Sequence, residues 1–249
     1  MSKTKTLIVL PAYNEEKSIS NLLSRLDFVY EEFNLNLEVL VVNDGSTDST
    51  LEIVQNYKSQ YKLHIKDIQP NKGLANAIKE GFSNALNRVT ENDIIIVMDA
   101  DDSHTPGLIL QMTRLIHEGA DIVIASRYQK GSIIKGLTRF RRFLSWGASI
   151  LFRIMIGVEG VRDYTCGYRA YKANILKTAL THYKEEFIQQ SGFAAMSEVL
   201  LKLNKFEPII LEVPFVLRYD LKKSSSKMDI WLTIRQTISM VFEYRFHIK

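Results

Sequence analysis

The sequence has 249 residues, of which 46% are hydrophobic and 24% charged, and its formal net charge is +4. This length suits one α/β domain with additions, and the composition excludes a disordered or low-complexity chain. The single cysteine, Cys166, excludes an internal disulfide. No linker composition marks a second domain, so we expect a main domain over residues 1–226 and a C-terminal amphipathic helix over residues 227–249.

The lengths of the apolar runs indicate whether the chain is secreted or crosses a membrane. The first residues lack the basic start and apolar run of a secretory signal. Arg153 interrupts the apolar run at 150–156, so no segment reaches the roughly 18–20 apolar residues that a membrane-spanning helix needs. We therefore expect a cytoplasmic protein with peripheral contact to the cytoplasmic face of a membrane, and no nucleic acid partner.

Apolar strands alternate with amphipathic helices along the first half of the chain. Strands are predicted over residues 6–10, 37–42, 63–68, 93–98 and 121–126. Apolar residues at helical spacing follow at 19–26, 51–54, 74–85 and 108–117. The small residues of the third helix, among them Gly81, would let it pack closely on a sheet. This alternation predicts an α/β fold with a mainly parallel, Rossmann-like sheet covered by helices on both faces.

Four acidic residues, Glu15, Asp44, Asp99 and Asp101, follow predicted strands directly. They would meet at the carboxyl edge of the sheet, where ligands of such folds bind. Because four carboxylates would repel one another, we expect a divalent cation or hydrogen-bond donors among them. An isolated Asp-x-Asp pair is more often a turn or a helix cap. Asp99 and Asp101, however, are the last of an ordered series of strand-end acids. This position favours a site in which the two carboxylates and a diphosphate bind the same Mg²⁺ or Mn²⁺ ion.

Four motifs in this order resemble those of family 2 glycosyltransferases, namely Leu10–Glu16, Val42–Asp48, Asn71–Gly73 and Asp99–Asp101. The resemblance implies a GT-A fold and a nucleoside diphosphate sugar as the donor. It implies that Asp99 and Asp101 hold the metal. His104 follows this motif and could contact the donor, and a loop or helix-capping role is the alternative. The resemblance also implies that the donor nucleotide is contacted by Pro11, Ala12, Tyr13, Glu15, Asp44, Lys72, Asp99 and Ala100.

The second half of the chain is similar to the polyprenyl-phosphate sugar synthases of that family, the group that includes dolichol-phosphate mannose synthases. The similarity lies in Ser126–Tyr128, Arg139–Arg142, Asp163–Arg169 and Val213–Arg218. It implies an acceptor phosphate site made of Arg127, Arg141, Arg142, Arg169, Arg218, Ser226 and Lys227, with Glu198 near the acceptor. The chain departs from the usual pattern at Asp102, where a leucine is more common, and before Ser226, where the usual Gly-Glu is missing.

A phosphate acceptor also fits the distribution of charge. Ten Lys and Arg residues stand against two acids between Arg127 and Lys172, a net +8. A solvated basic face is the ordinary explanation, and a surface for phosphates or anionic headgroups is the alternative. A phosphate monoester is already an anion, so it needs cations that hold it against the donor diphosphate rather than a general base. A structural ion pair is the commoner role of a single arginine, yet we predict a catalytic set of Asp101, Arg127, Arg141 and Arg218.

Two segments have the pattern of helices that lie in a lipid headgroup layer. Residues 140–155 place apolar side chains at helical spacing beside arginines. Residues 230–246 repeat the pattern with tryptophan and tyrosine beside it. A helix that packs on the protein core gives the same stripe, so both interpretations stay open for the second segment.

These features predict a metal-dependent hexosyltransferase that transfers a sugar to a polyprenyl or dolichyl phosphate with inversion at the anomeric carbon. Mannose and GDP-mannose are expected from the resemblance, with UDP-sugars as alternatives. A second hypothesis is a transferase of the same fold that glycosylates a hydroxyl group in surface polysaccharide or glycolipid synthesis, with Glu198 as the general base. A third is an inactive, membrane-associated nucleotide-binding protein, and the acids at 44, 99 and 101 count against it.

Overall fold

A seven-stranded sheet is the centre of the computed structural model, which describes residues 4–192, 194–222, 235, 236, 238–240, 242 and 244, without the side chains of residues 139–142 and 148. The strand order is β3 (Lys62–Ile68), β2 (Leu37–Asp44), β1 (Thr6–Ala12), β4 (Ile94–Val97), β7 (Arg169–Lys172), β5 (Ile122–Ser126) and β8 (Ile210–Pro214). Only β7 runs antiparallel to its neighbours in this sheet. The predicted mainly parallel sheet is confirmed.

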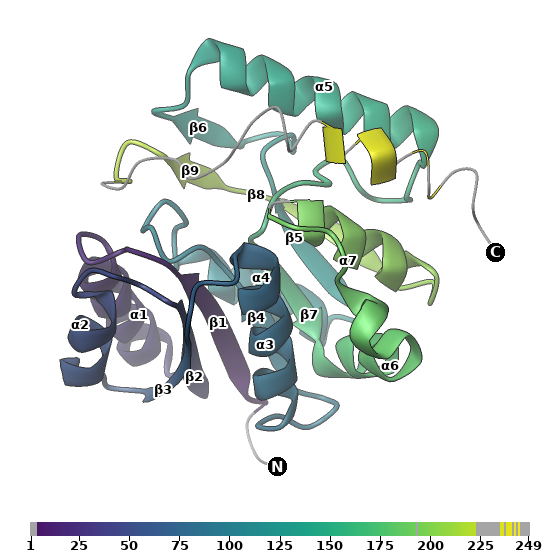
Figure 1. Ribbon diagram of the computed structural model, residues 1–249. Helices are drawn as coiled ribbons and strands as arrows, with labels where there is room; N and C mark the ends of the chain where they lie inside the picture. Colours follow the sequence, from purple (N-terminus) through teal and green to yellow (C-terminus); the bar gives the residue numbers. More distant parts are fainter. Residues whose placement is uncertain are drawn as a thin grey trace.

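Helices connect the strands and cover both faces of the sheet. They are α1 (Ile19–Phe33), α2 (Thr50–Asn56), α3 (Leu74–Leu86), α4 (Leu108–His117), α5 (Arg139–Met155), α6 (Ala173–Tyr183), the short 3₁₀ helix η1 (Lys184–Phe187) and α7 (Ala194–Asn204). Figure 1 shows α1 behind the sheet and α3 in front of it, beside α6. The four helices that the sequence pattern predicts correspond to α1 through α4.

The core lies between the central strands and these helices. All eight residues of β2 are buried, and its central run, residues 39–42, is apolar because both faces of the strand are covered. The predicted close contact of the third helix with the sheet is confirmed at Gly81. A Cβ atom there would lie 2.5 Å from Cγ1 of Val9 on β1, so any larger residue would push α3 away from the sheet. This packing holds the strand ends, and the loops that follow them, in fixed positions.

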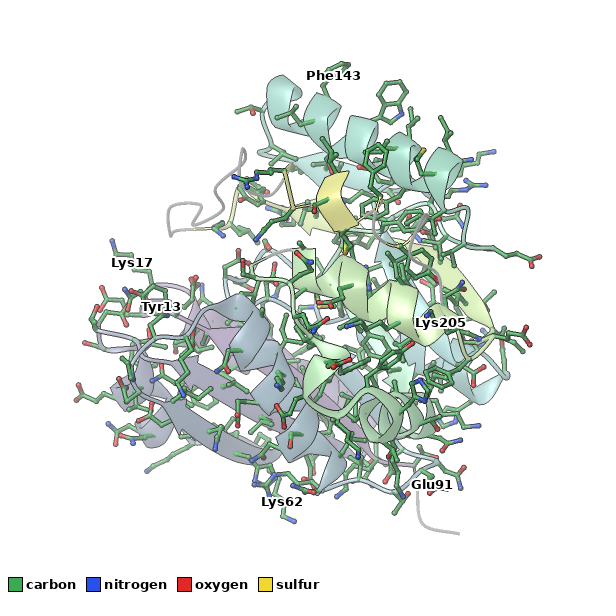
Figure 2. All side chains as sticks on the ribbon, turned by 45° about the vertical axis from the view of Figure 1, so that its right-hand side comes forward. Tyr13, Lys17, Lys62, Glu91, Phe143 and Lys205 are labelled. Carbon is green, nitrogen blue, oxygen red and sulfur yellow. The ribbon has the colours of Figure 1, made fainter. Side chains whose placement is uncertain are left out.

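A second layer lies above the carboxyl edge of the sheet (Figure 1). It consists of α5 and of two short parallel strands, β6 (Ile133–Lys135) and β9 (Val216–Arg218). The inner side of α5 packs through Phe152, whose ring stacks on Tyr164 with 4.8 Å between the centroids. Its outer side exposes Phe143, Trp146 and Ile154, and Figure 2 shows Phe143 pointing away from the body of the protein.

Within the part of the chain that the structure describes, no helix has the length and apolar character to cross a membrane. The predicted C-terminal helix and the domain boundary at residue 226 fall mostly outside that part. At the described positions, Met240 is buried and the hydroxyl of Tyr244 donates to the carbonyl of Leu201 on α7 at 3.2 Å. Ile238 is exposed. One side of this segment therefore contacts the protein, while part of its apolar stripe faces outwards.

Candidate active site

The loops after β1 and β2 are joined to each other at the carboxyl edge of the sheet. The backbone N–H of Asn14 donates to Oγ of Ser46 at 3.0 Å, and that of Glu15 donates to Oγ1 of Thr50 at 2.7 Å. The buried carboxylate of Glu15 accepts the hydroxyl of Ser18 at 2.8 Å. Figure 2 shows Tyr13 at this edge of the molecule. The loop fixed in this way carries the predicted donor contacts Pro11, Ala12 and Tyr13.

Asp44, at the end of β2, organises the loop that precedes α3. Its buried carboxylate accepts the backbone N–H of Lys72 at 2.9 Å and of Gly73 at 2.7 Å, and the side-chain amide of Asn71 at 3.0 Å. Gly45 makes the close approach of the two loops possible, because it has φ +66° and a Cβ atom there would lie 2.3 Å from the backbone nitrogen of Asn71. The structure thus brings the carboxylate of Asp44 and the backbone of Lys72 together, and their contact with a donor nucleotide stays a prediction.

Asp99 and Asp101 follow β4 and differ in their surroundings. The side chain of Asp99 is 37% exposed, whereas that of Asp101 is 6% exposed. One carboxylate oxygen of Asp101 accepts the hydroxyl of Ser103 at 2.6 Å, and the other accepts Nζ of Lys222 at 2.6 Å. Burial acts to raise the pKa of Asp101, but Lys222, His104 and Ser103 outweigh burial and hold it below its ordinary value. Asp101 is therefore an anion that already has a cation beside it.

The pKa of Asp99 is shifted in the opposite direction. Loss of hydration raises it, and the carboxylates of Asp101 and Glu15 act in the same direction, against His104 and Lys222. A carboxylate in this position gains from any further positive charge, because its negative neighbours make ionisation unfavourable. The pair thus has the electrostatic character of a cation site.

His104 stabilises the loop after β4. Its Nδ1 accepts the backbone N–H of Asp99 at 3.1 Å, which leaves Nε2 as the ring nitrogen that carries hydrogen. Its ring is buried, stacks on Tyr168 with 5.0 Å between the centroids and meets Phe215 edge-on at 5.9 Å. Of the two roles predicted for His104, these contacts favour the structural one.

Asp102 has a left-handed backbone, with φ +61°, and its carboxylate lies 2.5 Å from Nη1 of Arg25 on α1. Aspartate is one of the few residue types that adopt this backbone readily. The ion pair fastens the turn between the two candidate metal ligands and the next helix. Asp102, which departs from the usual family pattern, thus has Arg25 as its ion-pair partner.

The donor set fits a hard divalent cation. Among the described residues no group of three or more His, Cys, Asp and Glu side chains could hold a metal by itself. Mg²⁺ is commonly bound by one or two carboxylates together with substrate phosphates, and Asp99 and Asp101 supply that number. Nζ of Lys222 on Asp101 is a stand-in for a cation and shows that this oxygen is directed at positive charge.

Arg127, which follows β5, forms a buried ion pair with Asp163. Its Nε and Nη2 donate to the two carboxylate oxygens at 2.7 and 2.6 Å, and Nη2 also donates to Oγ1 of Thr165 at 2.5 Å. Asp163 further accepts the backbone N–H of Cys166 at 3.0 Å. Despite its burial, the pKa of Asp163 is lowered by Arg127. The arginine is therefore held rigidly, with Nη1 making no hydrogen bond to any described residue.

A cavity of about 310 Å³ adjoins this arginine, between the loop after β5 and α5. The hydroxyl groups of Tyr128 and Ser145 are hydrogen-bonded across it at 2.8 Å. Its lining residues are Arg127, Tyr128, Ile134, Leu137, Phe143, Ser145 and Trp146. The cavity thus joins one guanidinium and two hydroxyls to apolar and aromatic walls, a combination that suits an amphiphile with an anionic head.

Residues 7–180, more than half of the chain, match the glycosyl transferase family 2. The chain belongs to that family. This glycosyltransferase is 32% identical over 212 residues to the dolichol-phosphate mannosyltransferase of Pyrococcus furiosus, an alignment that covers 85% of the chain and 56% of the relative. It is 31% identical to the polyprenol monophosphomannose synthase of Mycolicibacterium smegmatis, over 70% of the chain and 63% of the relative. The chain thus spans 56% and 63% of the length of these two curated relatives.

A third relative is matched over most of its length. The undecaprenyl-phosphate mannosyltransferase of Micrococcus luteus is 31% identical to this glycosyltransferase, over 84% of the chain and 82% of the relative. Among solved structures, glucosyl-3-phosphoglycerate synthase from Mycobacterium tuberculosis, in complex with Mn²⁺, UDP and phosphoglyceric acid, has a TM-score of 0.68 at 16% identity, over 98% of this chain and 79% of that one. Mannosyl-3-phosphoglycerate synthase from Rubrobacter xylanophilus gives 0.67 at 16% identity, over 96% and 73%. These structural matches confirm the GT-A fold of the glycosyltransferase.

Arg169 corrects one prediction about the acceptor site. Its side chain is completely buried, and its guanidinium donates to the carbonyls of Met196 at 2.5 Å and of Tyr164 at 2.7 Å. An acceptor phosphate cannot reach a group enclosed in this way. The prediction that Arg169 binds the acceptor phosphate is therefore wrong, and in this glycosyltransferase the residue joins β7 to α7 and to the loop before β7.

Glu198 and Arg218 are also engaged within the protein. Glu198 is buried, pairs with Lys202 at 2.7 Å and accepts the backbone N–H groups of Gln189 and Gln190, each at 2.8 Å. Arg218 is partly exposed and pairs with Asp220 at 2.9 Å. The structure gives Glu198 the role of holding the loop before α7, while the guanidinium of Arg218 lies near the surface, where a ligand can compete for it.

The remaining acceptor predictions concern residues with little or no description. Arg141 and Arg142 lie in the first turn of α5 with undescribed side chains, and Ser226 and Lys227 lie outside the described residues. Sequence reasoning missed Lys222, whose contact with Asp101 spans 121 positions along the chain. No local pattern in the sequence marks that lysine, although its place shortly after Arg218 is a weak signal.

Proposed function

We propose that this glycosyltransferase transfers a hexose, mannose, from a nucleoside diphosphate to a polyprenyl phosphate with inversion at the anomeric carbon. The observation that carries the proposal is the cavity beside Arg127, which offers a cation and hydroxyls at one part and apolar walls at another. Three relatives support it, two named as mannosyltransferases of dolichol phosphate and undecaprenyl phosphate and one as a polyprenol monophosphomannose synthase.

The donor would bind at the carboxyl edge of the sheet. Asp99 and Asp101 would hold Mg²⁺ or Mn²⁺, and the ion would supply positive charge that stabilises a diphosphate leaving group. The loops fixed by Glu15 and Asp44 would enclose the nucleoside, with Pro11, Ala12, Tyr13, Lys72 and Ala100 at or near its surface. Because hydrogen bonds already fix these loops, little conformational entropy is lost when the donor binds.

The acceptor phosphate would lie between Arg127 and the donor. A phosphate monoester attacks without losing a proton, so the site needs to hold two anionic groups close together rather than to remove a proton. Arg127 is rigid through Asp163 and has Nη1 available to a phosphate oxygen. Arg141, Arg142, Arg218, Ser226 and Lys227 stay proposed as further contacts to the acceptor phosphate.

The acids on this side of the molecule support a phosphate acceptor over a hydroxyl acceptor. Asp163 is fully buried and bonded to Arg127, so proton uptake would break a buried ion pair. Glu198 is paired with Lys202 and holds two backbone N–H groups. Each would have to leave its partners before it acted as a general base.

The apolar side of α5 supports peripheral contact with the cytoplasmic face of a membrane. Phe143 and Trp146 are exposed beside the cavity that they also line, and Ile154 continues the same side. Aromatic side chains at the edge of an amphipathic helix favour the headgroup layer. A lipid acceptor could thus enter the cavity directly from the bilayer.

The test is transfer of radiolabelled sugar from GDP-mannose, and from a panel of UDP-sugars, to a short polyprenyl phosphate with Mg²⁺ or Mn²⁺. We expect label in the lipid phase from GDP-mannose, no label without metal, and none with Asp101→Ala. Lys177→Met is the matched control, because Lys177 forms an exposed ion pair with Glu91 far from the carboxyl edge. Donor binding without any lipid label would refute the phosphate acceptor and leave the hydroxyl-acceptor hypothesis.

A further inference from the structure

Lys222 is a lysine in direct contact with a candidate metal ligand. Its Nζ lies 2.6 Å from Oδ2 of Asp101, and its side chain is 13% exposed. Hydrogen bonds between two charged groups are about twice as strong as neutral ones, and shielding from water strengthens this pair further. A divalent cation that binds Asp101 must therefore compete with Lys222 for the same oxygen.

The backbone that carries Lys222 is fastened over the metal loop by separate contacts. The N–H of Arg218 donates to the carbonyl of Ser103 at 2.9 Å, and that of Leu221 donates to the carbonyl of Arg218 at 2.9 Å. Upstream, the ring of Phe215 packs on His104. These contacts do not involve Asp101, so they would persist after Lys222 left it.

A displaced lysine would thus stay close to the metal. Its backbone remains fixed, and its flexible side chain lets the ammonium move by several ångströms while remaining within the site. The diphosphate that shares the ion with Asp99 and Asp101 would then be an anion within reach of the ammonium group. Lysine binds phosphate as a point charge, so no particular approach geometry is required.

We propose that Lys222 has two positions. Without metal its ammonium group pairs with the carboxylate of Asp101, and when the divalent cation binds there the ammonium group moves to the donor diphosphate and helps to position it. The idea rests on the proposed function for the presence of a diphosphate, but not on the nature of the acceptor. The binding of metal and donor would then be coupled. Metal alone must break the ion pair between Lys222 and Asp101, whereas metal with diphosphate gives Lys222 a new anionic partner.

The first test is titration of the protein with Mn²⁺, followed by the electron paramagnetic resonance signal of the free ion. Without nucleotide, we expect Lys222→Met to bind Mn²⁺ about tenfold more tightly than the wild type, since both the competitor and one positive charge are gone. Lys222→Arg, which keeps the charge, and Lys177→Met should match the wild type. Equal or weaker Mn²⁺ binding by Lys222→Met would overturn the proposal.

The second test measures whether Lys222 contributes to binding of the diphosphate. In the presence of saturating Mn²⁺, GDP or UDP should bind Lys222→Met about tenfold more weakly than the wild type in calorimetry. If nucleotide binding is unchanged or becomes tighter in this variant, Lys222 does not contact the diphosphate and the proposal fails. Neither result depends on transfer to a lipid, so failure here is distinct from failure of the proposed acceptor.

Discussion

Replacement of Asp163 by asparagine removes one charge from the buried ion pair with Arg127 and changes almost nothing in shape. Asp163 is completely buried and accepts Nε, Nη2 and the backbone N–H of Arg127, together with the N–H of Cys166. An asparagine has one acceptor oxygen in place of two and places an amide against the guanidinium. The variant therefore leaves a nearly buried positive charge without its counter-ion.

The expected loss is large. Breaking a buried pair by removing one partner costs about 3–5 kcal/mol in the free energy of unfolding. Single domains are stable by roughly 5–15 kcal/mol, so Asp163→Asn should lose roughly a fifth or more of the total. The double variant Arg127→Met/Asp163→Asn, in which no unpaired charge is left, should be more stable than Asp163→Asn alone.

Urea denaturation at pH 7, followed by circular dichroism, measures both differences. The lowered pKa of Asp163 fixes the pH dependence. Its contribution is complete above the unfolded pKa of about 3.9 and is lost as pH falls through the lower folded value. The gap between wild type and Asp163→Asn should thus persist at pH 5. A gap below about 1 kcal/mol at pH 7, or a double variant less stable than the single one, would refute this account of the pair.

Three further predictions concern other parts of the molecule. Phe143→Ser/Trp146→Ser should reduce sedimentation with phosphatidylglycerol vesicles at least severalfold and leave Mn²⁺ binding unchanged, whereas equal sedimentation would remove α5 from the membrane contact. Gly45→Ala should weaken nucleotide binding in calorimetry and lower the melting temperature, since its methyl group would meet the backbone of the next loop; an unchanged enzyme would contradict the close approach. Burial acts to raise the pKa of Glu38, but His64 and Lys5 outweigh it, so the melting temperatures of wild type and Glu38→Gln should differ above pH 4.3 and converge as pH falls through the lower folded value. A difference that stayed constant down to pH 2 would count against that sign.

The position of the candidate donor residues at one edge of the sheet was predictable because it depends on strand ends. Asp44 and Asp99 follow apolar runs, and a parallel sheet brings the carboxyl ends of its strands to one edge. The pattern therefore identified residues that the fold then placed together. The detailed contacts of Asp44 were not predictable, because hydrogen bonds to the 71–73 loop depend on the conformation of Gly45 rather than on residue type alone.

The acceptor side was harder to predict because charge alone does not show whether a side chain is buried. Arg169 begins β7, a strand of four residues that is inserted antiparallel between β4 and β5. A short strand of mixed composition gives almost no periodic signal, so its burial was invisible in the sequence. Lys222 was missed for a related reason, since its partner is remote along the chain.

In the proposed reaction, a phosphate oxygen held by Arg127 attacks the anomeric carbon of the sugar. The most direct measurement offers the enzyme a short polyprenyl phosphate and the matching polyprenol in equal amounts with GDP-mannose and Mn²⁺, and identifies the product by ³¹P nuclear magnetic resonance and mass spectrometry. We predict a mannosyl phosphodiester of inverted anomeric configuration and no glycoside of the alcohol. Transfer to the alcohol, or a phosphodiester that retains the donor configuration, would contradict the account.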